Sequence, residues 1–473
     1  MIDRAEILEL ASEWSLRPQV VEKDYVLGWL LAGIYQHPLL AEAWIFKGGT
    51  CLKKCYFETY RFSEDLDFTV TDEAQLDQTF LLGSFRQVAE WVYERTGIEV
   101  PVDQLRFEVF RNPRGRISCE GRVHYRGPVA PQGDLPRIKL DLAVDEVVVL
   151  EPQWRPVAHP YSDVSGGEFR ARSYPFEEIF AEKIRALGER SQPRDLYDVI
   201  SLFHRDEARH LASGIRQVLK DKCTFKGLAT PTVEAIQQRA GEIAGDWDNM
   251  LGYQLPALPS LDLYLGELPR LFRWLEEAEA VVAAPSVPMG SGELVYRRDL
   301  RSMGMRGDLR AALETIRFAA ANRLRVDLDY RDAKGERSTR RIEPYSLRRS
   351  EGGGVLLHAE HTGTREHRSY RIDRIMAARI ANEAFVPRWA VELSPDAPLT
   401  IQPPAVRATS GRGYAVSRRA AIRAARGPTF VYECEHCGKK FRHTRRDPRL
   451  RRHKAPGGWA CSGRTGHLVD TVY

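Results

Sequence analysis

Apolar residues recur at helical spacing in two long parts of the first 280 residues. Residues 5–35 place apolar side chains three and four positions apart, and the same period returns at residue 176 and continues to about residue 283. Between these parts, short apolar or alternating runs predict strands at residues 43–46, 65–70, 105–110 and 138–149. The pattern predicts an α+β fold, with a mixed core over residues 1–175 and a helical bundle over residues 176–283.

The rest of the chain divides at two segments with linker composition. A stretch rich in Pro, Ala and Ser follows the helical part, and a second stretch containing Pro403-Pro404 lies further on. Between them, a helical pattern at residues 309–321 precedes short strands with turn signals, which predicts a small β-barrel or sheet. We expect, in order, a linker at 284–300, a β domain at 301–395, a basic linker at 396–428 and a terminal module at 429–473.

The composition of the 473 residues is that of a globular protein, with 43% hydrophobic and 29% charged residues. No apolar run reaches the roughly 18–20 residues that a membrane span needs, and the first residues carry no secretory signal. Seven cysteines, an odd number, favour free thiols in a reducing cytoplasm. Net charge is only +5, but residues 407–454 hold fifteen Lys and Arg against three acids, which indicates an anionic partner.

The first group of residues with chemical potential joins a glycine turn to three acids. Gly48-Gly49 follows a predicted buried strand. Asp65 and Asp67 are two positions apart in the next strand, so they lie on the same face. A third acid, Asp141, lies on a later strand. Carboxylates that lie close together repel each other unless a cation lies between them, and Mg²⁺ accepts such oxygens together with substrate phosphates. The alternative is a solvated acid pair beside an ordinary turn.

The residues around this group resemble those of a known family. The runs at 46–50 and 61–68, with residues 22–25, 179–187 and 194–198, are similar in kind and order to the nucleotidyltransferases of the AbiEii/AbiGii abortive-infection toxin type. The resemblance covers roughly residues 1–280. It implies a polymerase β-like nucleotidyltransferase core over residues 1–175, completed by a helical bundle over residues 176–283.

The resemblance also implies roles for individual residues. It implies catalysis by Asp65, Asp67 and Asp141, which would bind two Mg²⁺ ions, and nucleotide binding by Gly48, Gly49, Thr50, Ser63, Lys183, Asp195 and Asp198. It further implies an NTP substrate, an RNA acceptor such as tRNA, and a separate antitoxin. Taken without the family, Lys183 and Asp195 would read as an exposed ion pair on a helix surface, worth about 0.3–0.5 kcal/mol.

A second group lies in the terminal module. Cys434 and Cys437 form a Cys-x-x-Cys hairpin, and Cys461 and several histidines follow. This spacing predicts a structural Zn²⁺ site, which would also supply folding energy to a module too short for a core. His453 is the favoured fourth ligand because residues 452–466 resemble the second half of a zinc ribbon. The other candidates are His467, then His436 and His443. A redox Cys-x-x-Cys pair, or reduced thiols without a role, are the alternatives.

Basic and aromatic residues surround this module, which favours binding of nucleic acid through phosphate contacts and base stacking over a solvated basic surface. In the middle of the chain, residues 306–390 resemble a WYL domain, although the tripeptide that names that family reads Val355-Leu356-Leu357 here. The resemblance implies that the residues that bind anions are Arg341, Arg368, Arg371 and Arg374. The alternative is that these arginines point to solvent.

Together these features predict a cytoplasmic nucleotidyltransferase that moves an NMP from an NTP to a nucleic-acid acceptor, with RNA favoured, and acts as a toxin or phage-defence effector without a membrane partner. Two other hypotheses remain open from the sequence. One is a regulator that senses nucleotide or nucleic acid through a transferase-like core without catalysis. The other is transfer of the NMP to a protein hydroxyl.

Overall fold

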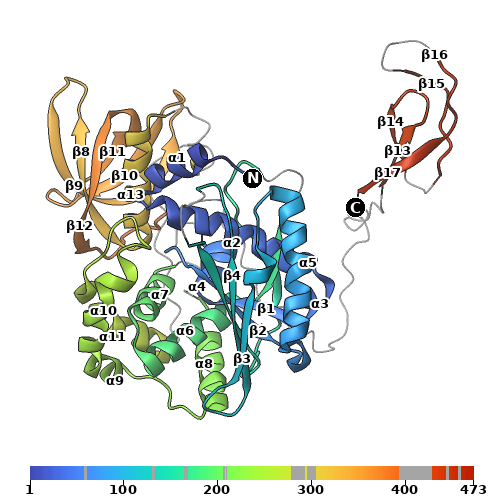
Figure 1. Cartoon of the computed structure of the whole chain (residues 1–473). Helices are drawn as coiled ribbons and strands as arrows, with labels where there is room; N and C mark the ends of the chain where they lie inside the picture. The colour runs from blue at the N-terminus through green and yellow to red at the C-terminus, as the bar shows by residue number, and fades with distance from the viewer. Residues whose placement is uncertain are drawn as a thin grey trace, which may run out of the picture. The chain divides into compact units, whose positions relative to one another are not determined.

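The computed structural model describes residues 1–57, 61–129, 134–163, 169–205, 208, 210–277, 293–295, 305–393, 429–443, 447–455 and 460–472 (Figure 1). The chain forms two compact units, Met1–Gln402 and Pro403–Tyr473. The expected basic linker at 396–428, and the expected linker at 284–300 except for residues 293–295, lie outside the described residues. No described helix is both long and apolar enough to cross a membrane.

The amino-terminal part of the first unit is built on a mixed sheet with the strand order β3-β4-β5-β2-β1-β7-β6. Two of its pairings, β2 with β5 and β1 with β7, are parallel, and the others are antiparallel. The strands are β1 (Trp44–Lys47), β2 (Asp65–Val70), β3 (Arg106–Arg111), β4 (Ile117–His124), β5 (Arg137–Ala143), β6 (Gln153–Pro156) and β7 (Arg170–Ser173). The predicted strand at 138–149 ends at Ala143, and β4, β6 and β7 were not predicted.

Helices around this sheet bury its apolar faces. They are α1 (Arg4–Trp14), α2 (Pro18–Gln36), α3 (Pro38–Ala43), α4 (Gly48–Cys51), the π-helical turn η1 (Leu52–Tyr56), the 3₁₀ turns η2 (Glu73–Gln75) and η3 (Val102–Gln104), and α5 (Gln78–Thr96). The helical pattern predicted over residues 5–35 is confirmed and forms two helices. Ser15 ends α1 in the left-handed conformation with φ of 55°, and Pro18 stands in the first turn of α2, where its missing amide proton costs nothing.

The predicted helical bundle follows the sheet. Its helices are α6 (Phe176–Arg190), α7 (Pro193–Phe203), α8 (Ala212–Lys226), α9 (Val233–Gln238), α10 (Ala240–Leu251) and α11 (Leu261–Glu277). Buried residues of α6, α7, α8 and α11 join the hydrophobic core of the sheet and α2, so sheet and bundle share one core. Because the core is shared, the buried faces of α6 and α7 pack against the sheet, and the bundle is not a separate domain.

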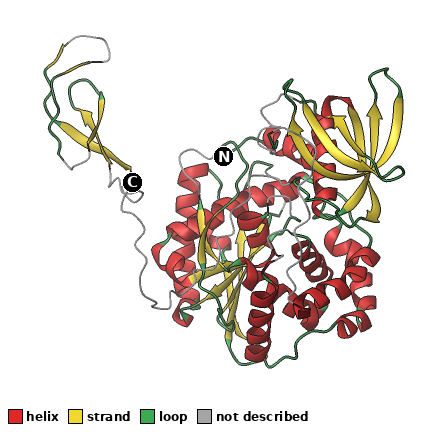
Figure 2. Ribbon diagram, turned by 180° about the vertical axis from the view of Figure 1, so that it is seen from behind, coloured by secondary structure: helices red, strands yellow, loops and turns green. Residues whose placement is uncertain are grey.

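The middle region consists of one helix and an antiparallel sheet (Figure 2). Its elements are α13 (Gly307–Ala321), β8 (Leu324–Arg331), β9 (Arg337–Arg349), β10 (Val355–His361), β11 (His367–Arg371), η5 (Ile372–Arg374) and β12 (Ile375–Ala384). The strand order is β11-β10-β9-β8-β12, and among the described residues β11 and β12 remain edges. Of the two expected forms, barrel or sheet, the middle region therefore has the open sheet, because closure of a barrel needs these two edges to pair.

The middle region packs on the helical bundle through α13. Phe318 of α13 belongs to the transferase core, and the side-chain carbonyl of Asn322 accepts a 3.0 Å hydrogen bond from the Tyr264 hydroxyl of α11. The guanidinium of Arg323 donates to the backbone carbonyl of His204 at 2.8 Å. These contacts make the middle region part of the same compact unit.

The second unit is a small β module. β13 (Thr429–Cys434), β14 (Lys440–His443) and β17 (Gly466–Val472) form an antiparallel sheet in the order β14-β13-β17, and β15 (His453–Lys454) pairs with β16 (Ala460–Cys461). Its buried apolar cluster consists of Tyr432, Cys434, Leu450 and Cys461.

Candidate nucleotidyl transfer site

The three predicted acids lie on neighbouring strands. In the parallel pairing of β2 with β5, Asp67 stands opposite Asp141, and Asp65 shares a face of β2 with Asp67 because strand side chains alternate. On the other side of β2, the antiparallel strand β1 places Lys47 opposite Asp67. The backbone hydrogen bonds of one sheet therefore bring together acids that are 74 and 76 positions apart in the sequence.

The glycine turn between β1 and α4 sits directly against these acids. Gly48 has φ of 79°, and a Cβ atom there would lie 2.1 Å from Oδ2 of Asp67. Only glycine tolerates both that backbone conformation and that contact. A Cβ on Gly49 would lie 2.6 Å from the guanidinium of Arg61 and 3.2 Å from Oγ of Ser63. The turn therefore leaves the room that a phosphate needs to approach its backbone.

Thr50 and Ser63 line this turn from two sides. Thr50 is buried, and its hydroxyl donates a 2.5 Å hydrogen bond to the backbone carbonyl of Asp65. This bond ties the turn to the first residue of β2. Ser63 is also buried, with its hydroxyl beside Gly49. Both residues thus stand within the predicted nucleotide site, and their part in nucleotide binding stays a prediction.

The acids are electrostatically strained in the absence of a cation. Burial, together with the charge of Asp141, raises the pKa of Asp67 to about 6, although Lys47 and Lys183 oppose the shift. Burial raises the pKa of Asp65 as well, and Asp141 adds to it while Lys23 opposes it. A divalent cation between these carboxylates would remove the repulsion. The donor set, two or three carboxylate oxygens beside an open phosphate turn, suits Mg²⁺.

The helical side of the site is held by buried ion pairs. Nε and Nη2 of Arg61 donate to the two carboxylate oxygens of Asp198 at 2.6 and 2.8 Å, and Lys183 Nζ lies 2.8 Å from the same carboxylate. Asp195 pairs with Arg190 at 2.6 Å and lies 3.8 Å from Lys183. Burial alone would raise the pKa of Asp198, but Arg61 and Lys183 hold it well below its usual range.

This arrangement gives the two predicted acids of α7 a definite place. The side chains of Asp195 and Asp198 are fully buried and engaged with cations of the protein itself. They therefore position Lys183, Arg190 and Arg61 around the site. Direct nucleotide contact by either acid stays a prediction.

A pocket of about 160 Å³ lies between the sheet and α6. Its walls include Lys47, Gly48, Asp67, Lys183 and Arg190. We call it the phosphate pocket, because three cations and a glycine turn meet there beside an acid. Sequence reasoning missed Lys47 and Arg190. Lys47 could have been found because it directly precedes the glycine turn, whereas nothing in the local sequence distinguishes Arg190 from other helix-end arginines.

Lys47 is buried, and nearby carboxylates balance its charge. Its ammonium lies 3.0 Å from Glu182 and 3.5 Å from Glu146. Burial alone would lower its pKa, but Glu146 and Glu182 raise it well above the usual value, so Lys47 remains charged next to Asp67. Lys47 therefore offsets the negative charge of Asp67, while the carboxylates of Glu146 and Glu182 balance the charge of Lys47 itself.

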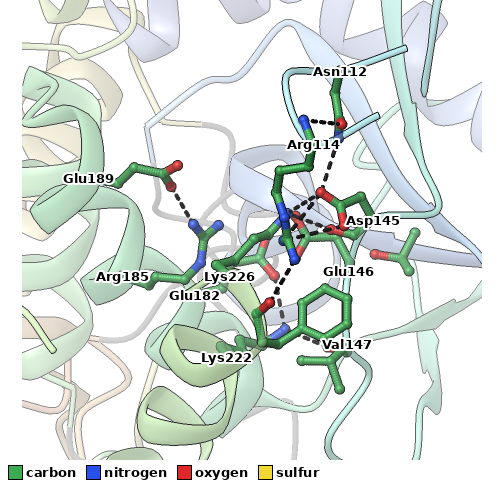
Figure 3. Close-up of polar contacts among 12 residues, drawn as sticks. Asn112, Arg114, Asp145, Glu146, Val147, Glu182, Arg185, Glu189, Lys222 and Lys226 are labelled. Atoms are coloured by element: carbon green, nitrogen blue, oxygen red, sulfur yellow. Dashed lines mark hydrogen bonds and ion pairs between the residues drawn. The ribbon is translucent and has the colours of Figure 1, made fainter. Parts of the chain in front are cut away.

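The carboxylates behind Lys47 belong to a wider network that joins the sheet to the bundle (Figure 3). Lys222 of α8 lies 3.2 Å from Glu182, and Lys226 lies 3.3 Å from Asp145, which follows β5. Arg114, in the turn before β4, reaches the other side of Asp145 at 3.3 Å. Through these contacts α6 and α8 are fixed to the end of the strand that carries Asp141.

The predicted zinc ligands also meet in space. One ligand atom each of Cys434, Cys437, His453 and Cys461 lies within 4.8 Å of the others. The two sulfurs of Cys434 and Cys461 are 3.9 Å apart, and Cys437 Sγ lies 3.3 Å from His453 Nε2. Three thiols and one imidazole at this separation fit tetrahedral Zn²⁺.

The orientation of His453 favours it over the other histidines as a ligand. Its Nδ1 lies 2.9 Å from the backbone carbonyl of Arg451, to which it donates, so the lone pair of Nε2 is directed at the thiols. His467 lies on β17 with an exposed side chain, and His436 is exposed as well. His443 Nδ1 bonds instead to the carbonyl of Asp447. These three are not part of the cluster.

The arginines proposed as anion binders in the middle region are engaged with acids. Arg341 pairs with Asp327 at 2.8 Å, Arg368 with Glu366 at 2.9 Å, and Arg371 with Asp373 at 2.7 Å. Each pair is exposed, so an anion would compete with a carboxylate for the guanidinium. No such pair is present for Arg374 among the described residues.

Two protein families match parts of the chain. The family model described as "Nucleotidyl transferase AbiEii toxin, Type IV TA system" matches residues 29–281, more than half of the chain. The chain belongs to the AbiEii nucleotidyl transferase toxin family. A second family model, the WYL domain, matches residues 311–380. The expected order of transferase and WYL-like region is thereby confirmed, and membership in the AbiEii family makes the chain a nucleotidyltransferase toxin by class.

Solved structures similar to this AbiEii-family chain include MenT4, a nucleotidyltransferase toxin from Mycobacterium tuberculosis. It is 20% identical, the match covers 59% of this chain and 91% of that chain, and the TM-score is 0.42. JHP933 from Helicobacter pylori is 17% identical over 55% of this chain and 94% of its own, with a TM-score of 0.37. No curated protein sequence matches the chain.

Proposed function

We propose that the protein transfers an NMP from an NTP to an RNA acceptor, and that it acts as a toxin or phage-defence effector opposed by an antitoxin. The observation that carries the chemistry is the set of Asp65, Asp67 and Asp141 on the adjacent strands β2 and β5, beside a glycine turn that admits phosphate. Family membership supports the reaction class, and the basic terminal module supports a nucleic-acid acceptor.

Each part of the site has a distinct task in this proposal. Asp65, Asp67 and Asp141 would hold two Mg²⁺ ions, which would supply Lewis-acid stabilisation of the attacking and leaving oxygens. Gly48 and Gly49 hold the triphosphate through their backbone amides. Lys183, fixed by the buried Asp198, contributes a positive charge to the phosphates from the helical side. Because these groups are preorganised, little rearrangement is needed as charge develops.

Incubation of the purified full chain with total RNA, Mg²⁺ and each labelled NTP in turn tests the proposal. We expect label in RNA, sensitive to nuclease and resistant to protease. Label that protease removes and nuclease leaves would indicate transfer to a protein hydroxyl instead. No incorporation from any NTP, with Mg²⁺ and a folded protein, would contradict catalysis and favour a nucleotide-sensing role.

A further inference from the structure

A second and larger pocket lies beside the catalytic acids, and we call it the β5 pocket. It has a volume of about 550 Å³, within the range of roughly 300–1,000 Å³ typical of small-molecule sites. Its walls come from α2, from the residue before β2, from η3 and from the facing ends of β4 and β5. Its polar lining residues include Gln19, Lys23, Glu64, Gln104, His124 and Arg137.

The strand order places the two pockets on different sides of Asp65 and Asp67. The phosphate pocket is lined by Lys47 and Gly48, on the β1 side of β2. The β5 pocket is lined by the ends of β4 and β5, on the other side. In nucleotidyl transfer the attacking oxygen and the leaving pyrophosphate are roughly in line across the phosphorus. With the triphosphate in the phosphate pocket, a hydroxyl that arrives from the β5 side approaches from the opposite side of these acids.

The walls of the β5 pocket include two residues that lie on or next to the strands of the acids. Glu64 directly precedes Asp65, and it forms a 2.9 Å ion pair with Lys23 of α2 at the pocket wall. Along β5, Arg137, Lys139 and Asp141 share one face, with about 13 Å between the Cα atoms of Arg137 and Asp141, and the ammonium of Lys139 lies 3.0 Å from Asp141. A group held near Arg137 can therefore extend along this face to Asp141.

The side chains of the pocket suit a nucleotide. The amides of Gln19 and Gln104 offer donors and acceptors for a base edge. The imidazole of His124 bonds through Nδ1 to the backbone carbonyl of Gln104 at 3.2 Å, which leaves Nε2 as an acceptor. Arg137 is exposed and can pair with a phosphate. A serine or tyrosine side chain would leave most of this volume empty.

We propose that the β5 pocket receives the terminal nucleotide of the nucleic-acid acceptor and directs its hydroxyl toward Asp65 and Asp141. This inference rests on the proposed transferase function. In the step, the hydroxyl oxygen forms a bond to the α-phosphorus of the NTP, and the bond between that phosphorus and the bridging oxygen of the β-phosphate breaks. Pyrophosphate leaves with its electron pair, and the hydroxyl proton is released to solvent.

Steady-state kinetics of Arg137→Ala and His124→Ala with bulk tRNA as acceptor test the assignment. We expect the KM for tRNA to rise by about tenfold or more, with the KM for NTP changed by less than about twofold, because only uniform acceptor binding is lost. Arg116→Ala is the matched control, since it removes an exposed arginine from the turn between β3 and β4. Its acceptor KM should equal that of the wild type.

A binding experiment separates failure of this inference from failure of the proposed function. An RNA oligonucleotide with a 3′-terminal 4-thiouridine is irradiated with the wild-type chain, and the cross-linked peptides are identified by mass spectrometry. Cross-links at Gln19, Lys23 or His124 support the pocket, and cross-links confined to other surfaces overturn it. If the wild type labels RNA but the two variants keep its acceptor KM, only the pocket assignment is wrong. If the wild type labels no RNA, both fail.

Discussion

The acid site of the transferase and the Cys/His cluster of the terminal module both gather groups from distant parts of the chain, but they are held in different ways. Asp67 and Asp141 are paired by the backbone of a seven-stranded sheet, over a core shared with the helical bundle. Among the described residues of the terminal module, the buried apolar cluster has four members, and two of these are the predicted ligands Cys434 and Cys461. A large core thus holds the acids in place, whereas we expect the thiols to need an ion to hold them together.

This difference indicates two uses of a metal. In the transferase, an ion would relieve repulsion between acids that the fold forces together, so we expect it to exchange with the substrate. In the terminal module, an ion would replace the core that the sequence is too short to build, so we expect it to stay bound. Experiments on either region can test this contrast.

Removal of zinc should unfold the terminal module and leave the transferase folded. The loss should be of the order of 10 kcal/mol for the module, because binding energy at such sites is folding energy. Limited proteolysis of the full chain with and without a zinc chelator measures it, with cleavage expected only beyond residue 428. Cys437→Ser should lower the zinc content, while Cys223→Ser, at a thiol outside the cluster, should not. Cleavage within α6 or α7 on chelation would contradict the contrast.

Asp67→Asn should reduce nucleotide incorporation by about 10³-fold or more, since several kcal/mol of metal-assisted stabilisation depend on this carboxylate. Incorporation of labelled NTP into RNA is the measurement. Asp103→Asn, an exposed acid on η3, is the control and should keep wild-type activity. Activity within tenfold of the wild type in Asp67→Asn would remove the acid site from the proposal.

Asp198→Asn should lower the free energy of unfolding by about 3 kcal/mol, because Arg61 and Lys183 would keep their charges in a buried setting without a counterion. Asp373→Asn removes one partner of an exposed pair with Arg371, and it should cost less than about 0.5 kcal/mol. Urea denaturation at pH 7 compares the two. Equal losses of unfolding free energy would mean that the ion pairs of α7 contribute no more to stability than surface pairs do.

The stability of the magnesium-free protein should decrease as pH rises from about 4 to 6. Folded Asp67, with its pKa raised to about 6, holds a proton that the unfolded chain has already released near pH 4. Above pH 6 the repulsion is fully present and costs about 1–3 kcal/mol. Asp67→Asn should lack this part of the pH dependence. Addition of Mg²⁺ should restore the lost stability of the wild-type protein at pH 7. Urea denaturation at pH 4.5 and 7.5 measures both effects.

Local sequence was sufficient for the parts of the protein that depend on short spacing. Gly48-Gly49 between a strand and a helix, alternating Asp65 and Asp67, and the hairpin of Cys434 and Cys437 all require residues a few positions apart. The strand at 65–70 and the bundle beginning at residue 176 were predicted for the same reason, since apolar periodicity is a local property. The strands β6 and β7, with only four residues each, gave no such pattern.

The tertiary structure alone decided the partners of the buried charges. Arg61 pairs with Asp198 across 137 positions, and Asp141 faces Asp67 because β5 rather than another strand lies beside β2. It also decided between the expected barrel and sheet, since β11 and β12 remain edges among the described residues. Such pairings follow from how sheet and helices pack around one core, and that packing depends on the whole chain. The chemical groups and their local spacing can be read from the amino-acid sequence, whereas the packing of sheet and helices sets which of these groups meet.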